Sequence, residues 1–126
     1  MAKVDKQQRK LAREAVLQAL YAKYVSNEEP KKVLQDIKSR YKFDKLTIKF
    51  VDELFSLTVE NSGELDKKIE SSLDNWTIDR LNVIDRLILQ MSLCEMIYLQ
   101  SYDISHKVTI SSALENAKKF SSEDSI

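Results

Sequence analysis

The most apolar stretch of the chain, residues 78–99, reads IDRLNVIDRLILQMSLCEMIYL and contains neither Gly nor Pro. Laid on a helix, its apolar side chains fall on nearly all sides, which is typical of a helix at the centre of a core. A membrane span is disfavoured because the stretch also holds polar side chains, among them Asp85, Arg86, Gln90 and Glu95. With Thr77 as a candidate N-cap, the sequence predicts one central core helix over residues 78–99.

Helical patterns extend from this stretch toward the N-terminus. Residues 5–24 form a predicted helix rich in Ala, Leu, Gln, Lys and Arg. Pro30 suits the first position of a second helix that runs to about Arg40. Residues 41–44 connect it to a third helix, and Leu65, Ile69 and Leu73 mark a fourth; the third helix carries Phe50, Leu54 and Leu57 at i, i+4 and i+7.

Toward the C-terminus, residues 100–106 read as a loop before a last helix. Ser112 and Glu115 have capping-box spacing, so this helix is expected to start as late as Ser112. Its apolar stripe consists of Ile110, Ala113, Leu114, Ala117 and Phe120. Because the whole chain has one Gly and one Pro, few tight turns are available, and the predicted fold class is all-α with about six helices.

The only Gly of the chain marks the expected boundary between two helical subdomains. It lies in the segment Asn61-Ser62-Gly63, between the third and fourth predicted helices. We therefore expect an N-terminal helical subdomain over residues 1–61 and a C-terminal one over residues 62–126. The length of 126 residues suits two closely packed halves of this size.

Composition bounds the compartment and the kinds of partner. The 20 basic and 20 acidic residues give zero net charge, so electrostatic recognition must come from local charge segregation. A single cysteine, Cys94, cannot form an internal disulfide and suits a reducing compartment. The first residues given show no apolar signal region, and no run approaches the ~20 apolar residues that a membrane span needs. The expected localisation is cytoplasmic, without a membrane partner.

Reactive side chains do not assemble into a catalytic or metal pattern. His106 is the only histidine and reads as an ordinary loop residue; no nucleophile-elbow signature supports a triad built on it, and no zinc spacing is possible. A phosphate-binding loop needs several glycines. Cys94 lies in the densest apolar run and reads as a packing residue. We therefore expect a protein that is not an enzyme and uses no cofactor or metal.

Five cations gather at the start of the first predicted helix. At about 100° per residue they share one arc roughly 120° wide, and the same arc continues into apolar side chains. We expect the apolar part to be buried and the basic part to emerge at one end of the bundle, where it either contacts phosphates or simply keeps the helix end solvated. The cations are Lys3, Lys6, Arg9, Lys10 and Arg13, and the apolar residues are Leu17, Leu20, Tyr21 and Tyr24.

Residues 64–85 show the opposite bias. Six acidic side chains stand against three basic ones, Lys67, Lys68 and Arg80. Such a face suits a basic protein partner, or it is an ordinary solvated surface. The acidic residues are Glu64, Asp66, Glu70, Asp74, Asp79 and Asp85.

Three blocks of sequence resemble the NusB family of bacterial transcription antitermination factors, in the family's order. The first is residues 12–21, AREAVLQALY, preceded by basic residues. The second is residues 75–81, NWTIDRL, followed by IDRLIL at residues 84–89 and by Glu95. The third joins KVTI at residues 107–110 and ALENAKKF at residues 113–120 with the turn SEDS at residues 122–125.

The resemblance implies a NusB-like all-α protein of two packed helical subdomains that binds RNA and protein and has no enzymatic activity. Family members bind the boxA sequence of ribosomal RNA transcripts together with NusE, a small-subunit ribosomal protein. The RNA polymerase antitermination complex that they join reads through terminators during ribosomal RNA synthesis.

The resemblance also assigns residues to each partner. It implies RNA contacts at Lys6, Arg9, Lys10 and Arg13 of the basic helix, and at Lys118, Lys119 and Asp124 near the turn after the last helix. It implies a NusE surface around Asp79 and Asp85.

This chain departs from the family pattern at four serines and at its end. Ser105, Ser111, Ser112 and Ser121 stand where the family commonly has Pro, Asn, Glu and Gly. The final family helix is expected to be missing, which would leave apolar surface exposed and lower the stability. The chain is then a fragment or a decayed relative, or self-association into a homo-oligomer compensates.

Two other interpretations remain open. The same helical unit resembles the RNA-binding N-terminal part of some ribosomal RNA cytosine methyltransferases, so the chain could be a fragment of such an enzyme. The second alternative is a helical protein-interaction module without an RNA role. Salt-insensitive partner binding would distinguish that module from an RNA-binding protein.

Overall fold

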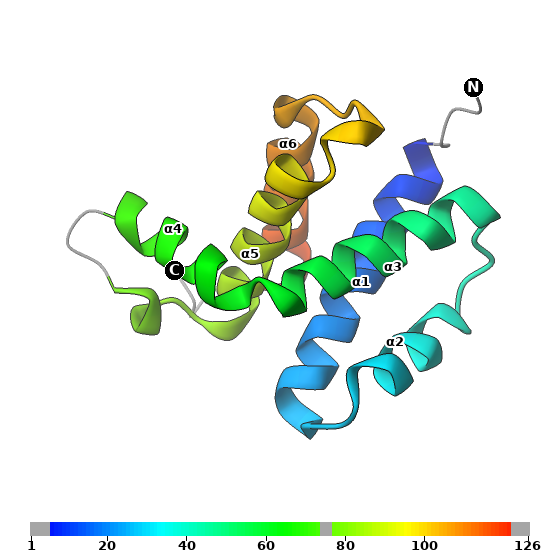
Figure 1. Ribbon diagram of the computed structural model, residues 1–126, viewed down its shortest axis with the longest axis horizontal. Helices are drawn as coiled ribbons and strands as arrows, with labels where there is room; N and C mark the ends of the chain where they lie inside the picture. The colour runs from blue at the N-terminus through cyan, green and yellow to red at the C-terminus, as the bar shows by residue number, and fades with distance from the viewer. Residues whose placement is uncertain (1–5, 74–76, 122–126) are drawn as a thin grey trace. The chain divides into compact units, whose positions relative to one another are not determined.

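The computed structural model describes residues 6–73 and 77–121 (Figure 1). Within them the chain forms six α-helices and two short 3-10 turns, with no strand, so the predicted all-α class is confirmed. No helix in these residues is long and apolar enough to cross a membrane. The elements in order are α1 (Lys6–Ser26), α2 (Pro30–Lys38), α3 (Lys45–Glu60), α4 (Ser62–Ser72), η1 (Ile78–Arg80), α5 (Val83–Tyr98), η2 (Gln100–Tyr102) and α6 (His106–Phe120).

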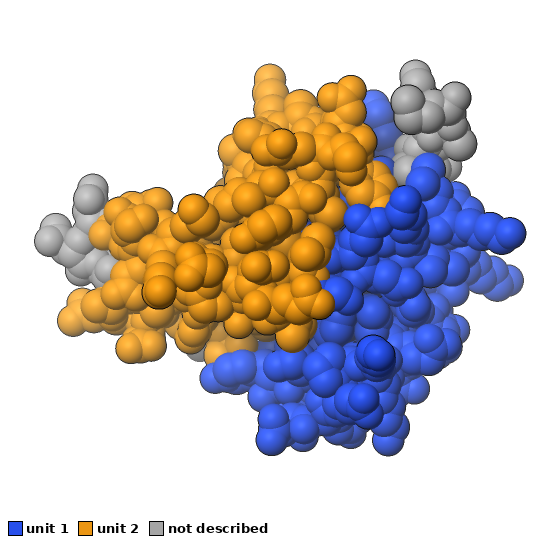
Figure 2. All heavy atoms as spheres, viewed as in Figure 1, with its two compact units in different colours: residues 1–56 blue, residues 57–126 orange. Residues whose placement is uncertain are grey.

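The chain divides into two compact units, residues 1–56 and residues 57–126 (Figure 2). The division falls inside α3, five residues before the boundary at residue 61 that the single Gly indicated. Gly63 itself lies in the first turn of α4, after the N-cap Asn61, and it does not have a positive φ. A single residue, Asn61, connects α3 to α4.

Unit 1 is built around the middle of α1, where every residue from Ala12 to Val16 is buried. α1 packs on α2, and Pro30 occupies the first turn of α2 as predicted. The Lys38 ammonium forms an ion pair with the Asp52 carboxylate at 2.7 Å, which ties α2 to α3. The apolar residues buried in this unit are Ala12, Ala15, Val16, Leu17, Ala19, Leu20, Val33, Leu34, Ile37, Phe50, Val51, Leu54 and Phe55.

The far end of α1 departs from the expected burial of its apolar arc. Leu17 and Leu20 are buried, but Tyr21 is 43% exposed and Tyr24 61% exposed. The arc therefore stops being a packing surface after Leu20. A tyrosine tolerates this position because its ring is apolar while its hydroxyl remains in water.

Unit 2 centres on α5, which packs against α4 and α6. The predicted single helix over residues 78–99 is wrong at its start, since a 3-10 turn, η1, precedes α5 and the chain is extended at Leu81 and Asn82. The Asn82 side-chain oxygen accepts a hydrogen bond from the Asp85 backbone N–H at 2.8 Å, so Asn82 and not Thr77 caps the core helix. The apolar residues buried here are Leu65, Ile69, Ile78, Leu87, Ile88, Met91, Cys94 and Leu99.

α6 begins earlier than expected, and its apolar stripe is partly exposed. Its N-cap is Ser105, whose hydroxyl accepts from the Val108 N–H at 3.3 Å, so the start at Ser112 is wrong. The buried residues of the helix are the polar Thr109 and Asn116, whereas Ile110 is 50% and Leu114 62% exposed. The buried face of α6 is thus polar, and the Thr109 hydroxyl donates to the buried Glu95 carboxylate of α5.

Candidate nucleic-acid interface

The first turns of α1 carry the predicted basic residues. Lys6 and Lys10 are exposed and Arg9 is half-buried, but only 5% of Arg13 is exposed. The expectation that the whole basic part of the arc faces solvent is therefore wrong at Arg13, which lies only one turn before the buried Leu17 on the same arc. Among the described residues, Lys6, Arg9 and Lys10 form the accessible part of the cluster.

Both arginines of this cluster lie over one aromatic ring contributed by α3. The guanidinium carbon of Arg9 is 4.2 Å from the centroid of the Phe50 ring, and that of Arg13 is 5.8 Å away. Phe50 is fully buried. Such cation–π contacts are worth about 0.5–1 kcal/mol at exposed sites and about 2 kcal/mol when desolvated. The ring therefore helps to fix the orientation of the half-buried Arg9 guanidinium, a planar group of the kind that binds phosphates in proteins.

The sequence indicated the two arginines but not the ring. Phe50 was predicted only as a core residue of the third helix, and nothing in its spacing relates it to Arg9. The contact depends on how α3 packs on α1, which is a tertiary feature.

The other predicted RNA contacts lie in unit 2. Lys118 and Lys119 are exposed in the last turn of α6, where cations interact favourably with the helix dipole. The Lys119 ammonium is 5.4 Å from the centroid of the Phe120 ring. Asp124 lies outside the described residues.

The predicted partner-binding carboxylates occupy two adjacent elements of unit 2. Asp79 is exposed in η1, and Asp85 is half-buried in the first turn of α5. Asp66, from the same acidic stretch, instead makes contacts within the unit. Its carboxylate accepts from the Arg86 guanidinium and from the Gln90 amide, both at 2.6 Å, which fastens α4 to α5.

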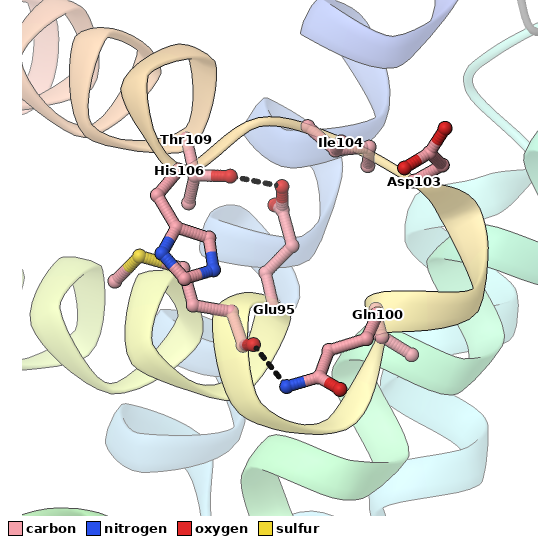
Figure 3. Close-up of a pocket in the computed structure, with 8 residues that line it drawn as sticks. Glu95, Gln100, Asp103, Ile104, His106 and Thr109 are labelled. Carbon is pink, nitrogen blue, oxygen red and sulfur yellow. Dashed lines mark hydrogen bonds between the residues drawn. The ribbon is translucent and has the colours of Figure 1, made fainter.

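A pocket of about 200 Å³ lies between the end of α5, η2 and the start of α6 (Figure 3). The Glu95 carboxylate, only 3% exposed, accepts from the Thr109 hydroxyl at 2.6 Å, and the two side chains point toward each other. No lysine or arginine lines this pocket, so it does not suit a phosphate. Its lining residues are Glu95, Met96, Leu99, Gln100, Asp103, Ile104, His106 and Thr109.

The remaining candidate reactive groups are Cys94 and His106. Cys94 is fully buried, as the sequence predicted, and burial raises the pKa of its thiol despite a hydrogen bond with Thr58. His106 is exposed at the start of α6. Within residues 6–73 and 77–121, no group of three or more His, Cys, Asp and Glu side chains could hold a metal ion.

Comparison of the sequence with known proteins gives consistent matches over nearly the whole chain. The model of the NusB family matches residues 10–126. The transcription antitermination protein NusB of Bacillus mycoides is 36% identical over 118 residues, which cover 93% of this chain and 87% of that protein. The NusB protein of Bacillus anthracis matches with the same identity and coverage.

The fold is similar to solved NusB structures. NusB of T. maritima superimposes with a TM-score of 0.80 at 28% sequence identity, covering 98% of this chain and 84% of that one. A chain from the crystal structure of the antitermination factors NusB and NusE in complex with dsRNA has a TM-score of 0.81 at 24% identity, covering 96% of this chain and 89% of that one.

Proposed function

The chain belongs to the NusB family, and from this premise we propose that it is an RNA-binding transcription antitermination factor. In this proposal it binds boxA-type leader RNA of ribosomal RNA transcripts together with NusE. The complex then joins the RNA polymerase antitermination machinery and promotes processive ribosomal RNA transcription. The chain acts by binding and catalyses no reaction.

The observation that carries the proposal is the basic end of α1. Lys6 and Lys10 are one helical turn apart and exposed, and Arg9 lies between them with its guanidinium against the Phe50 ring. Lysine and arginine side chains held close together neutralise several phosphates and release counterions. In the proposal Arg13 contributes through its neighbour: its guanidinium shares the Phe50 ring with Arg9 and helps to fix it.

We assign further contacts by the same reasoning. Lys118, Lys119 and Asp124 are proposed to contact RNA from unit 2. Asp79 and Asp85 are proposed to contact NusE, since carboxylates that are exposed or half-buried suit a basic ribosomal protein. The solved NusB of the same fold in complex with NusE and dsRNA motivates this choice of partners.

The test is a salt series of RNA binding with charge-reversal variants. Fluorescence anisotropy would compare a labelled boxA-like RNA with a scrambled RNA, with and without NusE. We expect the double variant Lys6→Glu, Lys10→Glu to lower affinity by at least about tenfold, because two phosphate contacts become repulsive. The slope of log affinity against log salt should also fall, by about 0.7 for each lost contact to single-stranded RNA.

A matched control is the double variant Lys31→Glu, Lys32→Glu, which reverses two equally exposed lysines of α2. These residues follow the far end of α1, and a helix of 21 residues is about 30 Å long. The control should retain affinity. If Lys6→Glu, Lys10→Glu keeps the affinity and salt slope of the unmodified chain while both remain helical by circular dichroism, the proposed RNA surface is wrong.

A further inference from the structure

Cations alternate with aromatic residues in the segment that links α2 to α3. Residues 40–45 read Arg40-Tyr41-Lys42-Phe43-Asp44-Lys45. Arg40, Lys42 and Lys45 are exposed, and the two aromatic side chains are half-buried. Neither the overall charge nor the helical periodicity of the chain singles this segment out.

The two aromatic rings form one ordered pair. Tyr41 and Phe43 stack with their centroids 4.8 Å apart and their planes only 6° from parallel. The Gln18 amide donates to the Tyr41 hydroxyl at 3.0 Å, which fixes the pair to α1. Half-buried, parallel rings of this kind resemble the stacking platforms on which proteins bind the bases of single-stranded RNA.

A second attachment holds the same segment beside the basic end of α1. The Gln8 side-chain nitrogen donates to the Lys42 carbonyl at 3.2 Å, and its side-chain oxygen accepts from the Asp44 N–H at 3.1 Å. Gln8 lies between Lys6 and Arg9 in the helix. The backbone of residues 42–44 is therefore attached to the first turn of α1, the turn that also carries Lys6 and Arg9.

The one acidic residue of the segment is directed toward α3. The Asp44 carboxylate accepts from the Thr47 N–H at 2.8 Å, a contact that caps α3 and lowers the pKa of Asp44. Its negative charge is thus partly compensated by the positive end of a helix. The segment therefore has a net positive charge, with three cations against the one carboxylate that caps α3.

We propose that residues 40–45 are a second part of the RNA-binding surface of unit 1, where bases of single-stranded RNA stack on the Tyr41–Phe43 pair and Arg40, Lys42 and Lys45 neutralise neighbouring phosphates. This inference rests on the proposed RNA-binding function and extends it from α1 to the link between α2 and α3. Gln8 and Gln18 are its positioning residues, since they order the segment before RNA arrives.

The test separates stacking from charge. The RNA is the single-stranded boxA-like oligonucleotide with 2-aminopurine substituted at successive positions, whose fluorescence reports stacking. We expect Lys42→Glu to weaken binding by about threefold to tenfold and to reduce the salt slope by about 0.7. Phe43→Leu should weaken binding with an unchanged slope, and it should abolish the fluorescence change at one or two positions of the RNA.

Two further variants test the positioning role of Gln8 and the effect of a charge reversal elsewhere on unit 1. Gln8→Ala removes both backbone contacts without changing charge, and it should weaken binding through loss of order while the salt slope is retained. Lys31→Glu is the matched single-charge control and should have no effect. Circular dichroism and thermal unfolding of each variant establish that the helices are intact.

The outcomes distinguish this inference from the function on which it rests. If Lys6→Glu, Lys10→Glu abolishes RNA binding while folded Lys42→Glu and Phe43→Leu bind as the unmodified chain does, the α1 surface stands and the platform is wrong. If none of these variants affects RNA binding, both are wrong. If Lys42→Glu and Phe43→Leu weaken only the binding of NusE, the segment is a protein-binding surface and the inference is overturned.

Discussion

The thiol of Cys94 illustrates how a single side chain can couple stability to pH. It is fully buried in α5, and desolvation is the main cause of its raised pKa. The hydrogen bond with Thr58 lowers this pKa, and the neighbouring charge of Glu95 raises it. The folded chain therefore keeps the proton at a pH at which the unfolded chain has begun to lose it.

We expect this difference to appear as an alkaline loss of stability. A group with a raised pKa in the folded state contributes its full stability below the ordinary pKa, here 9.0. That contribution is lost as the pH rises through 9.0 toward the higher folded value. Urea unfolding between about pH 7 and pH 10, under reducing conditions, should show a steeper decline for the unmodified chain than for Cys94→Ala. Parallel pH profiles for the two proteins would contradict this assignment.

At the same scale, the sequence could identify cations but not their exposure. The spacing of Lys6, Arg9, Lys10 and Arg13 places them on one arc of α1, and the structure keeps them there. Helical periodicity states which residues share a face, but it does not state where along the helix packing begins. Leu17 is the first apolar residue of the arc, and it suggested that packing begins there. In the structure the packing of unit 1 begins nearer the N-terminus, so Arg13 is already buried.

At the scale of elements, the start of α5 is set by Asn82. Its side chain caps the helix through the Asp85 N–H and also donates to the Ser121 hydroxyl at 3.2 Å. Thr77, the residue favoured by the sequence, precedes η1 without any side-chain capping bond. Both residues have short polar side chains that suit an N-cap, so residue type alone could not decide between them.

Substitution of the two residues should separate their roles. Asn82→Ala is expected to lower the free energy of unfolding by about 1 kcal/mol, the typical cost of losing an N-cap. Thr77→Ala is the control, and it should change that free energy by less than about 0.5 kcal/mol. Denaturant unfolding of both variants measures the difference. Equal losses would mean that the core helix begins before Asn82.

The orientation of α6 shows a second limit of sequence patterns at this scale. Five small or apolar residues form one stripe, yet the buried residues of the helix are Thr109 and Asn116, and Leu114 is exposed. The hydroxyl of Thr109 donates a hydrogen bond to the buried Glu95 carboxylate. A buried carboxylate without such a partner would destabilise the fold. This contact joins two helices, so the residue pattern of α6 alone could not predict which of its faces is buried.

For the whole molecule, zero net charge conceals a strong segregation. Residues 1–56 contain 13 Lys and Arg against 8 Asp and Glu, whereas residues 57–126 contain 7 against 12. The division between the compact units thus coincides with a change of sign. The basic unit holds the proposed RNA surface of α1, and the acidic unit holds the carboxylates proposed to meet NusE.

This segregation predicts that the two partners respond to different substitutions. Asp79→Lys should slow association with NusE at low salt, since exposed charges at an interface mainly steer encounter. RNA affinity of the chain alone should not fall. Glu70→Lys, an equally exposed charge reversal on α4, is the control. Stopped-flow association rates measure the effect, and identical rates for Asp79→Lys and Glu70→Lys would remove Asp79 from the proposed interface.

The double hydrogen bond of Gln8 also restricts how this protein can change over evolution. Position 8 must supply a donor and an acceptor at once, so glutamate, lysine and leucine each break half or all of the attachment. The two backbone groups that it contacts, the Lys42 carbonyl and the Asp44 N–H, are two residues apart. An insertion or deletion between them would move one of the two groups out of hydrogen-bonding distance. A polar side chain at the start of α1 therefore constrains the length of a loop 34 residues away in sequence.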